Sequence, residues 1–396
     1  MKILIITLHY LDANSGGSFA SRAYINAFCK LADSCMLMFP DRDVSITDHI
    51  DKKCILKGVK DKRSKIKKAL AIYTGDIHRY SNEVIEQVKE FNPDIVVFDN
   101  SRCSFRLIEK VKQMNKKVIT IHHNFEMEYY KGSKPNILWR IPFIYYMEKA
   151  ERDALLESNL NLTITKQDAV LLKEHYANHI NINIAYIGCF ESKSYISKIK
   201  ERIIKKDLTK RIHFVISGNL SSKQTEISLL NFLENMYPLL LKKIPHSVLT
   251  ITGRNPSNEI IKKCLKQPKI TLIPDPDNIQ EIIDTADVYI CPVFLGGGLK
   301  LRIMDGLKQG LPILTHEVSA RGYDEFKEAE YLFEYYDEKS FLISLDKLMA
   351  HFYQGKYSDN GIQNLYQSFF SFESGVNRIK EIVNYNHSFI IICFLF

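Results

Sequence analysis

Short apolar runs recur along the whole chain, and each is followed by a polar turn and a stretch with helical periodicity. The clearest runs occupy residues 2–7, 94–98, 117–121, 160–165, 182–187, 211–217, 247–252, 269–273, 287–291 and 312–315. Continuous apolar runs of this length are typical of parallel strands that helices cover on both faces. The alternation of strand and helix therefore predicts an α/β protein built from doubly wound parallel sheets.

The same pattern divides the chain into two domains of similar organisation. Residues 1–188 hold the first series of strands, and residues 189–208 are a polar, Lys- and Ser-rich stretch that we interpret as a linker. A second series fills residues 209–368, and a helical pattern follows over 369–386. The last residues, 387–396, are apolar but too few to span a bilayer, so they either dip into a membrane surface or form an extension without a role.

The turn after residues 287–291 combines three glycines with a lysine. Gly296, Gly297 and Gly298 follow the apolar run, and Lys300 falls in the first turn of a predicted helix over 299–307. Glycine lets the backbone approach a ligand closely, and the first N–H groups of a helix favour an anion. A lysine in a first helical turn is unfavourable, and a bound phosphate would resolve that conflict. The alternative is a plain tight turn with a solvated lysine.

The stretch GGGLKLRIMDGLKQGLPILT, residues 296–315, resembles the donor-binding signature of GT-B glycosyltransferases, specifically the retaining glycosyltransferase family 4 (glycosyl transferases group 1). In that family an acidic residue, usually Glu, holds the ribose hydroxyls of a nucleotide sugar, and here it is Asp305. Gly297 stands where many members carry a second Glu near the transferred sugar. The resemblance implies a GT-B fold, in which two Rossmann-like domains face each other across a cleft and the last helix crosses back to the first domain.

The resemblance also implies donor contacts at other turns. In the family a first loop ending in two glycines touches the donor phosphates, and an Arg and a Lys after the first strand of the second domain neutralise the diphosphate. Here Asn219 replaces that Arg, so we expect Lys223 and Lys300 to supply the charge. An ordinary turn or a solvated lysine is the alternative at each position. The implied donor-binding residues are Gly16, Gly17, Gly218, Asn219, Gly253, Arg254, Gly296, Gly297, Gly298, Leu299 and Asp305.

Two adjacent histidines end the apolar run at residues 117–121. An imidazole at the carboxyl end of a strand can exchange protons or hydrogen bonds with sugar hydroxyls near neutral pH. His123 directly precedes Asn124 and resembles the family histidine that faces the donor sugar, whereas His122 is the weaker match. The alternative is a histidine that caps local backbone. With Lys223, Lys300 and Asp305, His123 completes the set that the resemblance implies to be catalytic.

Charge and cysteine content add limits to this interpretation. The net charge is +8, and Lys and Arg are dense between residues 52 and 68. That segment either docks on anionic lipid headgroups or is a solvated surface, and its lack of aromatic residues argues against nucleic acid. The eight cysteines show no CxxC or zinc-ligand spacing, so we expect buried free thiols in a reducing cytosol.

Neither a metal site nor an export signal is expected. Asp275 and Asp277 have the spacing of a metal motif from the unrelated GT-A fold, but we expect Asp277 or Asn278 to cap a helix over 279–284. The first residues lack a cleavage site, and no apolar run reaches the roughly 18 residues of a membrane span. We therefore expect a cytoplasmic protein, peripheral on the inner face of the plasma membrane if the basic segment docks there.

The resemblance implies a retaining glycosyltransferase that moves a sugar from a nucleotide-diphosphate donor to a glycan or lipid-linked acceptor in cell-surface polysaccharide biosynthesis. It implies no cofactor other than the donor. Two alternatives stay open. One is a GT-B nucleotide-sugar epimerase, which would need acid–base carboxylates. The other is a non-catalytic nucleotide-sugar-binding protein, because Gly297 and Asn219 replace expected site residues.

Overall fold

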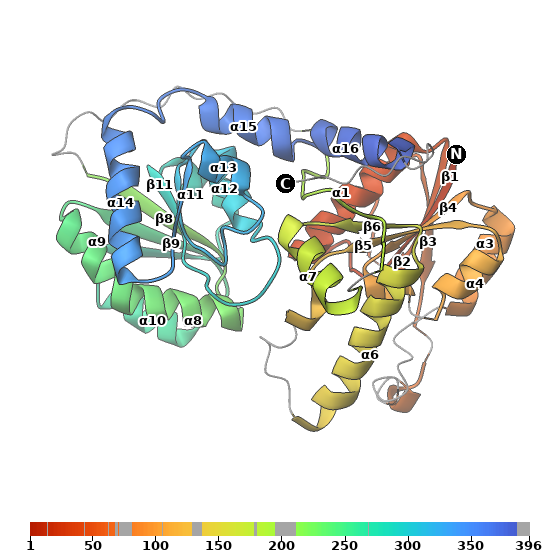
Figure 1. The fold of residues 1–396 in the computed structure, drawn as a ribbon. Coiled ribbons are helices and arrows are strands. Elements are labelled where there is room, and N and C mark those ends of the chain that lie inside the picture. Colours follow the sequence, from red (N-terminus) through yellow and green to blue (C-terminus); the bar gives the residue numbers. More distant parts are fainter. Residues whose placement is uncertain are drawn as a thin grey trace. The chain divides into compact units, whose positions relative to one another are not determined.

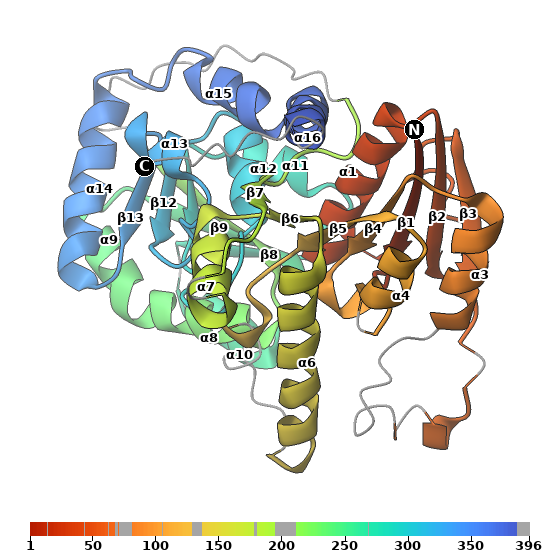
Figure 2. The same ribbon diagram turned by 45° about the vertical axis from the view of Figure 1, so that its right-hand side comes forward.

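The computed structural model describes residues 1–13, 15–42, 44–61, 63–67, 70, 81–104, 106–128, 137–177, 180–194, 211–267 and 269–385. The chain forms two compact units: unit 1 comprises Met1–Tyr195 and Phe369–Phe396, and unit 2 comprises Ile196–Ser368 (Figure 1). Each unit is built on one parallel sheet with helices packed on its faces (Figures 1 and 2). The predicted α/β class with doubly wound parallel sheets is confirmed. Residues 195–208 of the predicted linker and the apolar tail 387–396 lie outside the described residues.

Unit 1 contains a seven-stranded sheet in the order β3-β2-β1-β4-β5-β6-β7. Its strands are β1 (Lys2–Thr7), β2 (Ser34–Pro40), β3 (Cys54–Val59), β4 (Ile95–Asp99), β5 (Lys117–His122), β6 (Leu160–Thr163) and β7 (Ile184–Tyr186). Its helices are α1 (Gly16–Leu31), α3 (Ser81–Phe91), η1 (Ser101–Ser104), α4 (Ile108–Gln113), α6 (Ile137–Glu157), α7 (Lys166–Tyr176) and α16 (Phe372–Tyr385). Chain order reverses between β1 and β4, where Thr7 pairs with Asp99. In such sheets this reversal is the usual place for a ligand.

Unit 2 contains a six-stranded sheet in the order β10-β9-β8-β11-β12-β13. Its strands are β8 (His213–Asn219), β9 (Val248–Arg254), β10 (Ile270–Pro274), β11 (Val288–Cys291), β12 (Ile313–His316) and β13 (Leu332–Tyr335). Its helices are α8 (Lys223–Asn231), the π-helical η2 (Phe232–Met236), α9 (Tyr237–Lys243), α10 (Asn258–Leu265), α11 (Ile279–Asp284), α12 (Arg302–Lys308), α13 (Asp324–Glu328), α14 (Glu338–Tyr353) and α15 (Gly361–Phe370). The reversal lies between β8 and β11.

The central strands of both sheets are buried along nearly their whole length. All five residues of β4 and all four of β11 are buried, as the continuous apolar runs predict for strands covered on both faces. In unit 1, Leu4, Val96 and Val118 from three neighbouring strands belong to one buried cluster. This packing holds the carboxyl ends of the strands at one edge of each sheet, and the candidate sites lie there.

The last helix returns to unit 1, as the resemblance to GT-B enzymes implies. Helix α16 packs along α1, and Arg378 donates hydrogen bonds from Nε to the Ile187 carbonyl at 2.9 Å and from Nη1 to the Phe369 carbonyl at 2.8 Å. Gly375 lies so close to Phe190 that an added Cβ would come within 2.1 Å of its ring. The predicted helix over 372–385 is therefore confirmed and is part of unit 1.

Two elements differ from what the sequence predicts. Within the basic segment 52–68, of which residues 62 and 68 lie outside the described residues, the chain forms a strand that was not predicted, β3, at the edge of the sheet; Cys54 and Val59 are buried there and Lys57 is exposed. An edge strand with outward lysines is common because charge there discourages pairing with other chains. The helix predicted over 299–307 begins at Arg302 instead, so Lys300 precedes it.

Within the described ranges, no helix has both the length and the apolar character needed to cross a membrane.

Candidate functional site

In unit 2, two glycines lie side by side near the carboxyl ends of β8 and β9. Gly218 and Gly253 pair in register, with φ values of +136° and +147°. A Cβ on Gly253 would lie 1.7 Å from the carbonyl oxygen of Gly218, so no side chain fits there. The next residues, Asn219 and Arg254, also pair in register and are both exposed. The two strands thus end in a close backbone contact that only glycine permits, and β8 is one of the two strands between which the chain order reverses.

The glycine loop after β11 packs against the start of α8. Gly296 and Gly298 have φ values of +84° and +68°, which L-residues rarely adopt. A Cβ on Gly296 would come 2.7 Å from the Gln224 side chain, and the Phe294 N–H donates to Ser228 Oγ at 3.2 Å. Gly297 and Leu299 complete this turn and are partly exposed. The loops after β8 and β11 therefore lie side by side at the switch point of the sheet.

Lys300 stabilises this loop from inside. Its Nζ donates to the carbonyl oxygens of Gly297 at 2.7 Å and of Gly296 at 3.2 Å. Tyr323 Oη donates to the Lys300 carbonyl at 2.9 Å. Because the helix starts only at Arg302, the expected conflict between Lys300 and a first helical turn does not arise. That argument for a bound phosphate was wrong.

Arg302 is a cation at this turn that was not predicted from the sequence. Its Nη2 donates to Thr225 Oγ1 at 2.9 Å, and a Cβ on Gly218 would lie 2.8 Å from its Cζ. The guanidinium therefore lies at the turn after β8, beside the position where the family's usual Arg is replaced by Asn219. Asn219 instead accepts hydrogen bonds from Ser221 N and Oγ, which order the turn. A basic residue one helical turn before Asp305 was the available signal.

Lys223, the other expected cation, is exposed at the first position of α8. Its Nζ lies 3.1 Å from Glu226 Oε2, one turn further along the helix, and 83% of its side chain is accessible. The ion pair with Lys223 and a hydrogen bond from Ser257 lower the pKa of Glu226. An exposed i,i+3 pair of this kind contributes little to stability and leaves the lysine able to reorient.

Asp305 is held by two glutamines. Gln280 donates from Nε2 to Asp305 Oδ1 at 3.1 Å, and Gln309 donates from Nε2 to Gln280 Oε1 at 2.9 Å. Gln280 opens α11, whose N-cap is Asn278, with its side chain accepting from Gln280 N. The prediction that this turn caps a helix is confirmed. The chain of amides fixes the carboxylate at the start of α12.

Unit 1 gathers four polar groups at its own switch point. His123 Nε2 lies 2.6 Å from Asp99 Oδ1, and Thr7 Oγ1 donates to Asp99 Oδ2 at 2.7 Å. The His9 ring stacks on His123 with centroids 4.9 Å apart. Asp99 thus orients His123, while the next residue, Asn100, accepts from Arg102 N with its Oδ1 at the start of η1.

Burial and charge set the protonation of this cluster. Burial alone would raise the pKa of Asp99, but the charge of His123 and its hydrogen bond outweigh burial and bring the pKa to about 2. Burial, helped by the nearby charge of His123, lowers the pKa of His9 to about 3. Asp99 is therefore a carboxylate and His9 a neutral imidazole at physiological pH.

Gly16 and Gly17 open α1, directly beside this cluster. Ser15 is the N-cap and accepts from Ser18 N. A Cβ on Gly17 would come 2.5 Å from His9 Cε1, so the ring rests on the bare backbone of the first helical turn. The predicted strand–glycine–helix unit is confirmed, and it brings the helix start, His9 and His123 together.

His122 points away from this cluster. Its Nε2 lies 3.0 Å from Asn161 Oδ1 on the neighbouring strand. Burial lowers its pKa to about 4, although the hydrogen bond with Asn161 opposes that shift. Of the two adjacent histidines, His123 therefore belongs to the polar cluster and His122 to the sheet.

Buried carboxyl groups hold the segment that follows His123. Glu151 accepts from the Glu126 N–H at 2.8 Å and from Tyr176 Oη at 2.9 Å. Asp168 accepts from the Phe125 N–H at 3.1 Å. Burial, and then the charge of Glu126, raise the pKa of Glu151 well above its usual value. These carboxyl groups fix the backbone beyond His123.

Comparison with known proteins agrees with this architecture. Residues 201–351 match the family described as Glycosyl transferases group 1. HepE from Anabaena, solved with UDP, superposes with a TM-score of 0.66 at 10% identity, covering 97% of this chain and all of that one. The pneumococcal O-GlcNAc transferase GtfA, solved with UDP and GlcNAc, has a TM-score of 0.64 at 12% identity, covering 98% and 99%.

Two further proteins are similar to this chain. The lipopolysaccharide outer core galactosyltransferase WaaB superposes with a TM-score of 0.63 at 12% identity, covering 97% of this chain and 99% of that one. An uncharacterised 44.6 kDa protein from the cps region of Klebsiella pneumoniae is 28% identical over 112 residues, which are 26% of this chain and 29% of that protein. Residues 201–351 thus resemble the glycosyl transferases group 1 family, and the whole chain shares the GT-B fold of these solved structures.

Proposed function

We propose that the protein is a retaining glycosyltransferase that moves a sugar from a nucleotide-diphosphate sugar to a glycan or lipid-linked acceptor in cell-surface polysaccharide biosynthesis. The observation that carries the proposal is the surface between β8 and β11, where glycine turns meet Arg302 and Asp305 inside the segment that matches the family. It combines turns that only glycine can adopt with a cation and a carboxylate, which suits a nucleoside diphosphate.

In this proposal unit 2 binds the leaving group. Breaking the bond between the sugar and the diphosphate leaves negative charge on a phosphate oxygen, and fixed positive charge stabilises it in the transition state. Arg302 supplies a positive charge that a hydrogen bond to Thr225 holds in place, and Lys223 supplies a second positive charge on an exposed side chain. Lys300 acts mainly by shaping the glycine loop, because its ammonium hydrogen bonds to loop carbonyls. Asp305, oriented by Gln280, accepts hydrogen bonds from the ribose hydroxyls.

Unit 1 supplies the imidazole that contacts the transferred sugar. Asp99 fixes His123 through Nε2, which leaves Nδ1 for a sugar hydroxyl. A phosphate oxygen of the donor takes the proton of the acceptor hydroxyl while the new glycosidic bond forms on the same face of the sugar. This route needs neither a carboxylate nucleophile nor a bound metal.

The comparisons support the choice of donors and the setting. HepE and GtfA were solved with UDP, and WaaB is a lipopolysaccharide galactosyltransferase, so UDP-sugars are the first donors to test. The relative from a cps region supports a role in capsular polysaccharide. The exposed lysines of and around β3 support a peripheral, cytoplasmic-face contact with anionic lipid.

The test is the anomer first released from a donor. UDP-glucose, UDP-galactose, UDP-N-acetylglucosamine and GDP-mannose are each incubated with the protein, and proton NMR follows slow hydrolysis with water as acceptor. We expect one α-linked donor to release the α-sugar before mutarotation. Initial release of the β-sugar would contradict retention. Release of a 2-epimer of the donor sugar would favour an epimerase. A donor that binds but is turned over neither in the hydrolysis assay nor with added lipid-linked acceptors would favour a binding protein.

A further inference from the structure

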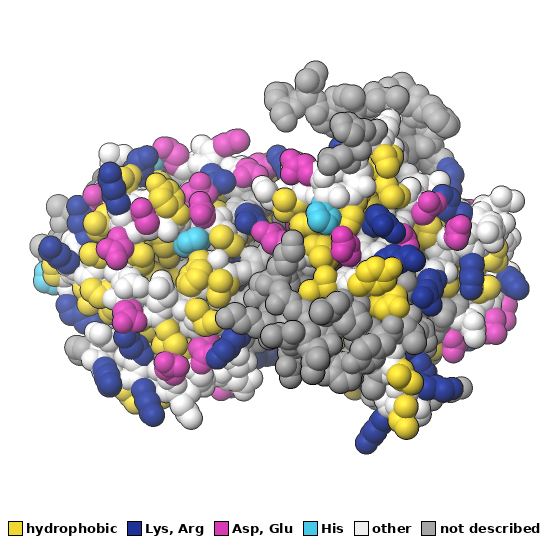
Figure 3. Space-filling model, turned by 60° about the horizontal axis from the view of Figure 1, so that its bottom comes forward, with side chains coloured by type: hydrophobic (Ala, Val, Ile, Leu, Met, Phe, Trp, Pro, Cys, Tyr) yellow, Lys and Arg dark blue, Asp and Glu magenta, His cyan; other side chains and the backbone are white. Residues whose placement is uncertain are grey.

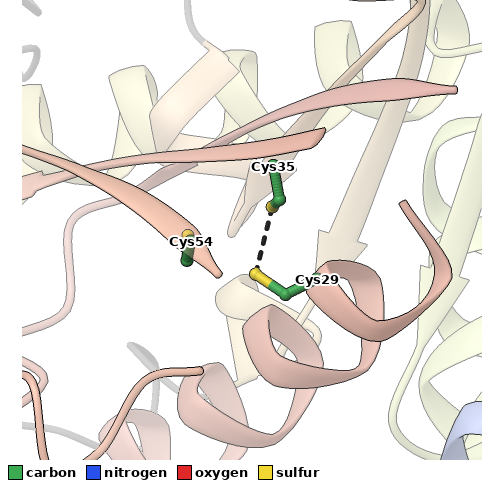
Figure 4. A group of neighbouring side chains, drawn as sticks. All are labelled: Cys29, Cys35 and Cys54. Carbon is green, nitrogen blue, oxygen red and sulfur yellow. Dashed lines mark hydrogen bonds between the residues drawn. The ribbon is translucent and has the colours of Figure 1, made fainter. Parts of the chain in front are cut away.

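Three cysteines that are far apart in sequence meet in unit 1. Cys29 comes from the last turns of α1, Cys35 from the start of β2 and Cys54 from the start of β3 (Figure 4). Parallel pairing places Cys35 directly beside Cys54. The three Sγ atoms all lie within 4.8 Å of one another, and Cys29 Sγ is 3.1 Å from Cys35 Sγ. Sequence spacing could not reveal this cluster, because its members belong to three elements.

The size of the sulfur triangle suits a metal ion. A Zn–S bond of about 2.3 Å in tetrahedral geometry separates two sulfurs by about 3.8 Å. The three sulfurs already lie within 4.8 Å of one another, and the closest pair, at 3.1 Å, needs to open by about 0.7 Å to reach that separation. All three side chains are buried, with exposures of 3%, 2% and 8%. Burial protects thiolate ligands from oxidation and competing solvent, as in structural zinc sites.

We propose that Cys29, Cys35 and Cys54 bind one Zn²⁺ ion as thiolates. Binding releases the three thiol protons, so two positive charges meet three negative ones and the buried site carries one net negative charge. A Cu⁺ ion would leave the site with two net negative charges, and burying two charges costs more free energy than burying one. Asp51 approaches the cluster through its backbone carbonyl, which accepts from Cys54 N at 2.9 Å, whereas its carboxylate accepts from Lys53 N at 2.9 Å. The protein ligands that we assign are therefore the three sulfurs.

The position of the cluster gives the ion a structural role. Cys35 and Cys54 lie at the amino ends of their strands, whereas Asp99 and His123 lie at or just beyond the carboxyl ends of theirs. The cysteine cluster is thus at the amino ends of the strands, whereas the polar cluster of unit 1 is at their carboxyl ends. Strand β3 is an edge strand with Cys54 and Val59 as its buried residues, so an ion would fasten it and β2 to α1. This inference does not depend on the proposed sugar transfer.

The test uses the full chain, stripped with a chelator under reducing conditions and then titrated with Zn²⁺ against a chromogenic chelator. We expect one ion per chain, release of protons on binding and a rise in Tm. X-ray absorption of the zinc-loaded protein should show three sulfur ligands at about 2.3 Å. Cys35→Ser should weaken binding by more than the roughly 10- to 100-fold that loss of an outer-shell partner costs.

The matched control is Cys264→Ser, which changes a cysteine of similar burial (3%) in α10 of unit 2. It should bind zinc like the wild type, and circular dichroism should show that both variants are folded. If Cys35→Ser does not fold, the number of sulfur ligands that X-ray absorption finds in the zinc-loaded wild type tests the proposal by itself. Zinc held only by nitrogen and oxygen ligands, equal binding by both variants, or no binding at all would overturn the proposal. Binding of Cu⁺ without Zn²⁺ would overturn the choice of ion.

Discussion

At the residue scale, single buried groups determine what the neighbouring histidines do. Asp99 is fully buried, and its two oxygens hold His123 and Thr7. His122, one residue earlier, faces Asn161 instead. The sequence predicted that one histidine of the pair would have a site role, and His123 was the preferred one. The partner Asp99 was not predicted, because pairing between residues 24 positions apart follows from the order of strands in the sheet.

Acidification should destabilise unit 1 through His122. Its pKa is about 4 in the folded protein and 6.5 when unfolded, so the unfolded chain binds the proton first and folding stability falls as the pH drops below 6.5. Between pH 7 and pH 5 this costs about 2 kcal/mol. We expect His122→Gln to lose correspondingly less of its unfolding free energy over that range in urea titrations. The exposed His246→Gln control should keep the wild-type pH dependence; equal slopes for all three proteins would contradict the assignment.

Arg302 should matter for nucleotide binding more than any exposed lysine. Arg302→Gln removes the charge at the β8 turn while keeping a shorter side chain that can still form hydrogen bonds. A hydrogen bond to a charged group contributes about 1.5–3 kcal/mol, so the Kd of the bound nucleoside diphosphate should rise about 10- to 100-fold by calorimetry. Lys347→Gln, an exposed change on α14, should leave the Kd unaltered. An unchanged Kd in Arg302→Gln would show that the guanidinium serves the fold alone.

At the element scale, tight turns at strand ends prepare the surfaces that we assign to ligands. The glycine signature, its preceding strand and the stop at Gly310, with φ of +71°, could all be predicted from sequence. The start of α12 could not, because Leu299 and Lys300 fit a helical period but serve the loop. Strand β3 was not predicted because only its first and last residues are buried, so the segment lacks the continuous apolar run that identified the other strands.

Gly253→Ala tests how closely the β8 and β9 turns approach. The added Cβ would overlap the Gly218 carbonyl at 1.7 Å, and the φ of +147° is strained for alanine. We expect a loss of about 3 kcal/mol in the stability of unit 2, seen as a lower Tm by calorimetry. Gly58→Ala in β3, where the Cβ would lie 3.0 Å from Asp41 Cβ, should stay within about 1 kcal/mol of the wild type. A wild-type Tm for Gly253→Ala would refute the close approach.

At the scale of the whole molecule, two sheets of the same kind each present polar groups at their switch points. The fold could be predicted from the recurring strand–turn–helix pattern, and the resemblance to a family rests on one signature. The partners of Arg302, Asp99 and the three clustered cysteines needed coordinates, because they depend on which strands are neighbours. On the face drawn in Figure 3, basic and acidic side chains are interspersed among the residues drawn in colour, so any attraction of this face to a membrane depends on local groups of lysines.

The basic segment contains such a group. Lys57, Lys65 and Lys67 are exposed, and each lysine near an anionic bilayer contributes about 1 kcal/mol. Changing all three to Ser should weaken binding to phosphatidylserine vesicles about a hundredfold in co-sedimentation. Phosphatidylcholine vesicles should bind neither protein. Retained binding of the triple variant would move any membrane contact elsewhere on the chain.

The central claim is that unit 2 binds a nucleotide sugar through the turn that contains Asp305. Its most direct test is ligand-observed NMR with UDP-, GDP-, ADP- and CMP-sugars on the wild type, on Asp305→Ala and on Asp346→Ala, an exposed carboxylate on α14 that pairs with Lys243 at 2.9 Å. We predict selective binding of one nucleotide by the wild type and by Asp346→Ala, and loss of that binding in Asp305→Ala. No binding of any donor, or binding that Asp305→Ala leaves intact, would contradict the assignment.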